Sequence, residues 1–174
     1  MRIVVTGIGS ISSIGSSAEE TLDSLIKMRP GIAPVKYLNT VHNTLPCGEI
    51  PLDEPALRRI INVDDDEIIT RTSLIGIIAA KEALAKAGLE GCIKGGEPAR
   101  MGFISGTTVG GMEKSEQYYG DFISNDNHKD YIGAHDCGAC TEKIADYFGA
   151  FEYISTISTA CSSAANSIAL GAEL

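Results

Sequence analysis

The stretch Ile154-Ser-Thr-Ile-Ser-Thr-Ala-Cys161-Ser-Ser-Ala-Ala-Asn-Ser-Ile168 decides the fold of this chain. Its first half is rich in β-branched residues, which favour a strand. Its second half consists of small residues, and the apolar ones recur at helical spacing. The change of pattern predicts a strand over residues 153–158 and a helix that begins at Cys161.

Cys161 is the candidate nucleophile because of this position. A thiol at the start of a helix lies at the positive end of the helix dipole, close to unpaired N–H groups. Both features favour the thiolate, the nucleophilic form of cysteine. A strand-to-helix turn also lifts the side chain clear of the sheet, as it does for the serine of many hydrolases. The local pattern leaves a buried, inert cysteine equally open, since free cysteines are commonly buried.

The remaining chain alternates strand and helix patterns. β-Branched, apolar runs predict buried strands over residues 2–8 and 101–105. Helices are expected over residues 70–87, 112–122 and 141–148, with Gly88 ending the first of them. Residues 29–55 and 124–137 are polar and are expected to be mainly loop, and a capping-box spacing from Ser17 predicts a further helix. This order favours a mainly parallel sheet covered by helices on both faces, a three-layer α/β/α fold.

Four blocks resemble the β-ketoacyl-acyl-carrier-protein synthases, the condensing enzymes of fatty-acid and polyketide synthesis. Thr159-Ala-Cys161 is similar to their active-site motif. Residues 2–9 resemble their opening strand and loop, residues 71–89 their long helix, and residues 100–111 the strand and glycine turn before the acyl pocket. Family members are more than twice as long. The resemblance therefore implies that residues 1–174 are the N-terminal thiolase-like domain, cut off within the Cys161 helix.

The resemblance also implies a mechanism. Cys161 would accept an acyl group from an acyl carrier protein, and the carbanion formed by decarboxylation of malonyl-carrier would attack that acyl group. No metal or organic cofactor is implied. The family's catalytic histidines lie in the part that this chain does not match, so we expect acylation without condensation. The alternative is a non-catalytic thiolase-like partner subunit with a chain-length or scaffolding role. Such partners usually lack the cysteine, so its presence favours the enzyme.

Further site residues follow from the resemblance alone. Val109 would line the acyl channel, and Tyr131 would match the aromatic residue that enters the partner subunit's pocket. Thr159 would brace the nucleophile turn. For each of the three, an ordinary place in the core is an equally good interpretation. The family's dimers pair the strand before the nucleophile with its symmetry mate, so a homodimer through residues 153–158 is implied, and an unpaired apolar edge is otherwise a hazard.

Composition and charge exclude several function classes. The 174 residues are 44% hydrophobic and carry a net charge of −9, which disfavours nucleic-acid binding because phosphates need a basic surface. No apolar run approaches the ~20 residues of a membrane span, and the start does not resemble a signal peptide, so a cytoplasmic protein is expected. The acidic residues 64–67 replace a basic approach that the family presents to its carriers. A carrier would then dock elsewhere, for example through Arg58, Arg59 and Arg71, or the acidic run is a solvated cluster at a helix start.

Other motifs point more weakly to chemistry. Cys137-Gly-Ala-Cys140 has the spacing of a redox pair or half a zinc site, but no second such pair is present. Gly7-Ile-Gly9 begins a dinucleotide fingerprint whose third glycine is replaced by Ser12. Glycines 106 and 111 have P-loop spacing without the lysine that binds phosphate. His128 and His135 remain possible bases for Cys161 in a hydrolase dyad.

Overall fold

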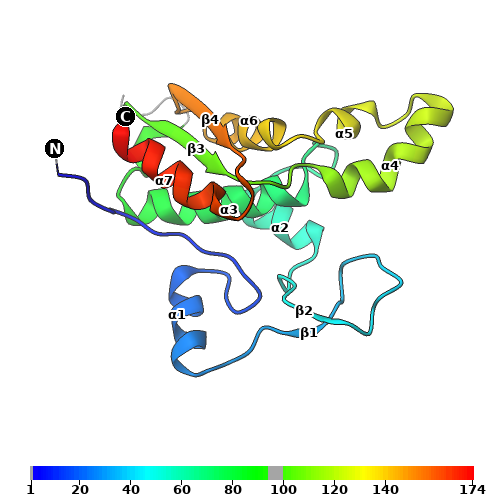
Figure 1. Cartoon of the computed structure of the whole chain (residues 1–174), viewed down its shortest axis with the longest axis horizontal. Coiled ribbons are helices and arrows are strands. Elements are labelled where there is room, and N and C mark those ends of the chain that lie inside the picture. The colour runs from blue at the N-terminus through cyan, green and yellow to red at the C-terminus, as the bar shows by residue number, and fades with distance from the viewer. Residues whose placement is uncertain (1, 94–99) are drawn as a thin grey trace. The chain divides into compact units, whose positions relative to one another are not determined.

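The computed structural model describes residues 2–93 and 100–174 (Figure 1). These residues form two compact units. The first unit comprises Asp66–Gly76 and the described part of Glu90–Leu174, together with the start of the chain. The second unit comprises Val4–Asp65 and Ile77–Leu89. No helix within the described ranges is both long and apolar enough to cross a membrane.

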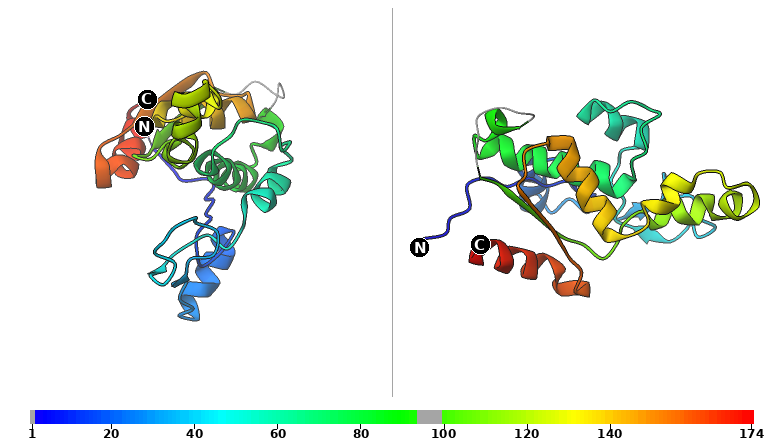
Figure 2. Two further views of the ribbon diagram at one scale, coloured as in Figure 1. Left: turned by 90° about the vertical axis from the view of Figure 1, so that its right-hand side faces the viewer. Right: turned by 90° about the horizontal axis from the view of Figure 1, so that it is seen from above.

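The first unit is built on a pair of parallel strands. In this pair, β3 (Gly102–Gly106) lies beside β4 (Tyr153–Ile157), with Gly102 opposite Tyr153 and Gly106 opposite Ile157. Helices α6 (Cys137–Phe148) and α7 (Ser163–Glu173) pack on these strands from opposite faces (Figure 2). The predicted α/β class, with parallel strands between layers of helices, is confirmed. Both strands lie within one residue of their predicted bounds.

The connection from β3 to β4 contains more helix than predicted. The predicted helix over residues 112–122 is confirmed as α4 (Met112–Asn125). The loop expected over residues 124–137 is partly wrong, because α5 (Lys129–Gly133) lies within it and α6 begins at Cys137. Asp136 explains the early start of α6, since its Oδ1 accepts the Ala139 N–H at 2.8 Å. An aspartate N-cap of this kind is a standard helix-start signal.

The apolar core of the first unit lies between α6, the strands and the first turn of α3 (Arg71–Lys86). Phe148, Ile144 and Leu74 are buried there, and the Phe148 ring packs edge-on against Phe151. Burial of each such side chain contributes roughly 1.5–3 kcal/mol. Thr156 donates a hydrogen bond to Thr141 at 2.8 Å, which ties α6 to β4. These contacts fix the strands whose ends carry the candidate site.

The second unit contains two short strands and helices that the sequence predicted only in part. Ser17 caps α1 (Ala18–Ile26) as predicted, accepting the Glu20 N–H at 3.1 Å. β1 (Ala33–Pro34) pairs antiparallel with β2 (Pro46–Cys47), and α2 (Glu54–Ile61), which was not predicted, follows. The later part of α3 ends as predicted at Gly88, which is left-handed with φ 71°. Leu89 N–H then closes the helix on the Leu84 carbonyl at 2.9 Å.

The buried strand predicted over residues 2–8 is wrong. None of these residues that the structure describes is in a strand, and Val5 is 81% exposed. Gly7 and Gly9 lie directly against α3, where a Cβ on Gly9 would stand 1.9 Å from the Ala79 carbonyl oxygen. A strand needs the backbone of a neighbouring strand, and this segment contacts a helix instead. The close approach also gives Gly7 and Gly9 a packing role rather than a nucleotide-binding one.

Glu82 on α3 secures the second unit, which leads to a pH-dependent prediction. Its carboxylate accepts the N–H groups of Ser10 at 2.9 Å and of Ala18 at 3.0 and 3.1 Å. Burial raises the pKa of this carboxyl, but those N–H groups and Lys86 outweigh it and hold the pKa below the ordinary value. Because the pKa of Glu82 is lower in the folded protein than in the unfolded chain, the ionised carboxylate stabilises the fold when the pH is above the unfolded pKa of 4.5. This stabilisation is lost as the pH falls through the folded pKa.

Glu82→Gln keeps the shape of the side chain and removes its charge. We expect the free energy of unfolding to fall by about 1 kcal/mol at neutral pH, because hydrogen bonds to a charged acceptor are stronger than neutral ones. As pH falls below 4.5 and through the folded pKa of Glu82, the free energies of unfolding of the two proteins should approach each other. Urea unfolding at neutral pH and in acid measures this. A deficit that is equally large in acid would show that the carboxylate charge is not the cause.

Candidate active site at the nucleophile turn

The turn between β4 and α7 presents Cys161 to solvent. A short 3-10 helix, η2 (Ala160–Ser162), joins the strand to α7, and Cys161 is exposed at its centre. Ala160 adopts the left-handed conformation with φ 51°. This conformation costs a residue with a Cβ roughly 1–2 kcal/mol, so the surrounding structure must hold it in place. Strained backbone held in this way is typical of functional turns.

Side chains from the first turns of α7 provide that support. Ser163 Oγ accepts the Thr159 N–H at 2.9 Å and donates to the Ala160 carbonyl at 2.8 Å. Ser162 Oγ donates to the Thr159 carbonyl at 2.8 Å. Asn166 Nδ2 donates to Thr159 Oγ1, also at 2.8 Å. The polar groups of the two residues before Cys161 are therefore bound by Ser162 of η2 and by residues of α7, whereas among the described residues the Cys161 N–H donates to no acceptor.

Gly106 allows α7 to start close to the sheet. A Cβ on Gly106 would lie 2.6 Å from the Ser163 carbonyl oxygen and 2.8 Å from the Ala164 Cα. The next residue, Thr107, donates its N–H to the Ile157 carbonyl at 3.1 Å, which keeps the two strand ends together. The carboxyl ends of β3 and β4 thus meet at one edge, and the turn with Cys161 leaves from that edge.

Val109 follows β3 from the same edge. It is 49% exposed, and its loop is held by Thr107, whose Oγ1 accepts the Val109 N–H at 3.2 Å and donates to the Val109 carbonyl at 3.0 Å. Gly110 and Gly111 behind it pack on the backbone of residues 134–136, and the Gly111 N–H donates to the His135 carbonyl. The topology therefore brings Val109, Thr159 and Cys161 to one edge of the sheet. The glycine turn serves packing at that edge.

Tyr131 lies elsewhere in the first unit. It is on α5, half-buried, with its ring 5.1 Å from the Tyr118 ring and the Lys114 ammonium 5.8 Å from its centroid. These contacts place the ring within its own chain. Its role in a partner subunit's pocket stays a prediction.

The histidines and cysteines outside the turn have other neighbours. His135 Nδ1 is 2.9 Å from Ser115 Oγ, and His128 stacks on Tyr118 at 4.2 Å, so in the described structure neither is bonded to Cys161. Cys140 is 3% exposed, and burial raises the pKa of its thiol. These are the properties of a core cysteine rather than of a reactive one. Among the described residues, no three of His, Cys, Asp and Glu gather as a metal site would require.

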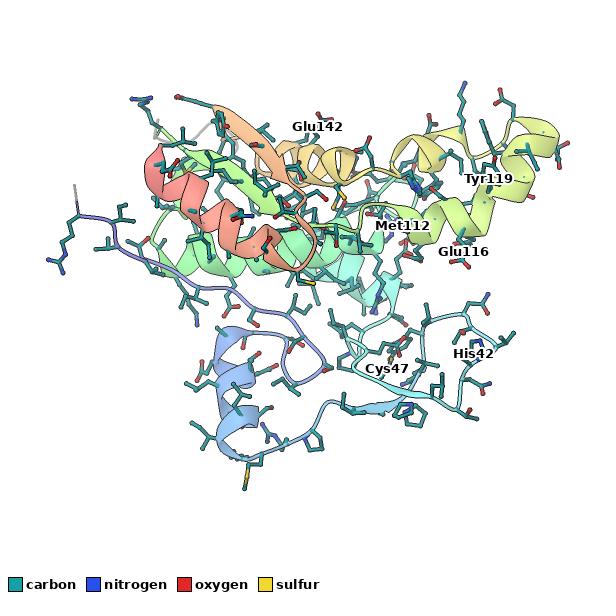
Figure 3. The ribbon with its side chains drawn as sticks, in the orientation of Figure 1. His42, Cys47, Met112, Glu116, Tyr119 and Glu142 are labelled. Atoms are coloured by element: carbon teal, nitrogen blue, oxygen red, sulfur yellow. The ribbon has the colours of Figure 1, made fainter. Side chains whose placement is uncertain are left out.

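Figure 3 labels His42 and Cys47, to which the sequence analysis assigned no role; both belong to the second unit. Arg58 in the same unit corrects one expectation. It is 4% exposed, pairs with Glu54 at 3.0 Å and donates to the Asp64 carbonyl, so it is not available to dock a carrier.

The acidic residues 64–67 do not lie in the first turn of α3, which begins at Arg71. Glu67 instead pairs with Lys143 of α6 at 2.8 Å.

The sequence did not identify the residues that hold the turn. Ser162, Ser163 and Asn166 read only as small or polar positions of a helix. An alanine-rich pattern such as that of α7 is typical of close helix packing or of a central, buried position, but only Ser163 of α7 is buried and Ile168 is 74% exposed. A helix is buried all round only when neighbours cover every side, and α7 packs on β3 and β4 along one side. The one available signal was the density of hydroxyls immediately after the cysteine.

A strand pair covered by helices and a cysteine in a strained strand-to-helix turn define a thiolase-like fold with a presented thiol. The sequence matches the family described as "Beta-ketoacyl synthase, N-terminal domain" over residues 1–174. This chain belongs to the β-ketoacyl synthase family.

Individual relatives agree with this family. Nodulation protein E of Rhizobium meliloti is 29% identical over 174 residues, covering 97% of this chain and 41% of the relative. The 3-oxoacyl-[acyl-carrier-protein] synthase 1 of Escherichia coli (strain K12) is 31% identical over 122 residues, covering 68% of this chain and 28% of that enzyme. The solved ishigamide ketosynthase/chain length factor matches with a TM-score of 0.72 at 24% identity, over 97% of this chain and 44% of that one. This chain spans less than half the length of these relatives.

Proposed function

We propose that this chain forms the nucleophile-bearing part of a 3-oxoacyl-acyl-carrier-protein synthase. Cys161 takes an acyl group from an acyl-carrier thioester, and the acyl-enzyme is then the electrophile for malonyl-derived carbanion. In the first step the Cys161 thiol gives its proton to solvent and attacks the thioester carbonyl as the thiolate; the new Cys161 thioester forms as the bond from the acyl carbon to the carrier sulfur breaks, and the carrier thiolate leaves and takes up a proton from solvent. The observation that carries the proposal is the presentation of Cys161 in a strained turn within a chain of the condensing-enzyme family.

The geometry of the turn supports three requirements of acyl transfer. The sulfur is exposed and needs no opening of the core to meet a thioester. The Cys161 N–H, which in the described structure has no acceptor of its own, is suited to hold the developing oxyanion. Val109 leaves the same edge of the sheet and supplies an apolar wall for an acyl chain. The protein partner is a carrier bearing acyl and malonyl groups, and the protein acts in the cytoplasm as a homodimer through β4.

A non-catalytic role remains the second candidate. The solved structure with the same fold is a ketosynthase/chain length factor, so the fold by itself does not decide between an enzyme and a partner subunit. Cys161 favours the enzyme. The intact mass of the native protein separates the two: about 18.3 kDa would favour a stand-alone module, and more than twice that an enzyme with its histidine-bearing part.

Selective labelling tests the proposal on the native protein. An electrophilic acyl mimic should modify Cys161 well ahead of the other four cysteines, because the other four are half-buried or buried (Cys47, Cys92, Cys137 and Cys140). Peptide mapping by mass spectrometry after a short exposure gives the order. Labelling of the unfolded protein, in which all five should react alike, is the control. Equal labelling of all five in the folded protein would contradict an activated thiol.

A further inference from the structure

Asn166 reaches back from α7 to the residue that begins the nucleophile turn. Its Nδ2 lies 2.8 Å from Thr159 Oγ1 and 3.4 Å from Ser162 Oγ. Asn166 is itself exposed, so its side chain is not fixed by packing in the core. The hydrogen bond to Thr159 therefore sets the Asn166 side chain apart from the other exposed side chains of α7.

The bond acts on the part of the backbone that aims Cys161. Thr159 directly precedes Ala160, the residue with φ 51°, and Cys161 follows. The Thr159 carbonyl accepts from Ser162, and Thr159 Oγ1 is contacted by both Ser162 and Asn166. Fixing both the main chain and the side chain of Thr159 leaves little freedom for the turn to relax from its left-handed residue. A reacting sulfur needs this kind of fixed position, because small displacements from the attack geometry are costly.

We infer that Asn166 is a positioning residue for Cys161 and acts through the Thr159 hydroxyl. The inference rests on the proposed acylation of Cys161. Asn166 touches neither the sulfur nor the acyl group in this mechanism. Its contribution is to keep the turn in the conformation from which the thiolate attacks.

Asn166→Ala in the full-length protein tests the inference. The single-turnover rate constant for acyl transfer from an acyl carrier protein to Cys161 should fall about five- to tenfold, the loss expected of one hydrogen bond. The number of acylated sites per chain at the end of the reaction should not change, because Asn166→Ala slows the attack without reducing the fraction of folded protein. This second readout therefore separates a slower attack from a loss of folded protein. Ser167→Ala is the matched control, because within residues 2–93 and 100–174 the hydroxyl of Ser167 bonds only its own helix, at the Ala164 carbonyl.

A double-mutant cycle with Thr159→Val identifies the route. If Asn166 acts through the Thr159 hydroxyl, Asn166→Ala should cost nothing further in the Thr159→Val background. Thr159→Ser keeps the hydroxyl and should retain the effect of Asn166. Additive losses, or an Asn166→Ala protein as fast as the unmodified one, would overturn the inference. Failure of the proposed function gives a different result: Cys161 is alkylated by iodoacetamide but takes no acyl group in the unmodified protein.

Discussion

Cys161→Ala in the full-length protein should abolish the acyl-enzyme. The other four cysteines are half-buried or buried, so none is expected to replace the exposed thiol, and loss of a catalytic nucleophile typically costs about 10⁴-fold or more in rate. The acyl adduct is measured by intact mass after incubation with an acyl carrier protein, and condensation by product analysis. Both should fall to background, while the circular dichroism spectrum and thermal unfolding stay close to those of the unmodified protein, because Cys161 is exposed.

Cys47→Ala is the matched control for this experiment. Cys47 lies in β2 of the second unit, so its loss should leave acylation unchanged. Cys161→Ser adds a finer test, since a hydroxyl in the same place is a far weaker nucleophile at neutral pH than a thiolate. Persistence of a stable adduct in the Cys161→Ala protein would place the nucleophile elsewhere. Absence of any adduct in the unmodified protein would favour the non-catalytic partner subunit.

Gly106→Ala should have the second largest effect, although the residue carries no reactive group. The new Cβ would meet the backbone of Ser163 and Ala164 at 2.6 and 2.8 Å, and backbone atoms cannot rotate away as a flexible side chain can. The start of α7 must therefore move off β3, carrying with it the hydroxyl of Ser163 that holds the nucleophile turn. We expect the rate of Cys161 acylation to fall about 100-fold, since misplacement of a reacting group by ~1 Å has this order of effect.

The same substitution should lower the free energy of unfolding by about 1–3 kcal/mol, the range for an overpacked core site. Gly102→Ala on the same strand is the control, because its new Cβ would find Tyr153 atoms at 3.6 Å, an ordinary contact. Single-turnover acylation and urea unfolding measure the two effects. If Gly106→Ala acylates as fast as Gly102→Ala, close packing of α7 on β3 does not position Cys161.

Much of the first unit could be predicted because its signals are local. The β-branched run at residues 153–157 and the small residues after it specify a strand and a helix in any surroundings. The cysteine is placed between them by sequence order alone. The helix predicted over residues 112–122 is local in the same sense, and so is the helix end at the left-handed Gly88 in the second unit. The missed helices α2 and α5 have only 8 and 5 residues, which is too few for a helical repeat to stand out in the sequence.

The errors have a common physical origin. Residues 2–8 have the composition of a buried strand, but strand formation depends on a partner edge, which composition does not encode. The alanines of α7 and the stripe on α1 at Leu22, Leu25 and Ile26 indicate faces that can be buried, yet these faces are exposed here. Whether an apolar face is covered depends on what packs against it, and the pattern of one segment holds no information about that.

The sequence by itself determined the order of β3, α4, α6, β4 and α7 in the first unit, the family, and the place of one thiol between β4 and α7, because each depends on residues adjacent in the chain. Only the tertiary structure decided that Gly106 makes room for α7 and that Thr159 is bound by Ser162 and Asn166. It also decided that Arg58 is buried and Cys161 exposed. The physical reason is that backbone clearance, hydrogen bonding and burial depend on which atoms lie close together in space. Tertiary packing determines these neighbours, and they can be far apart in the sequence.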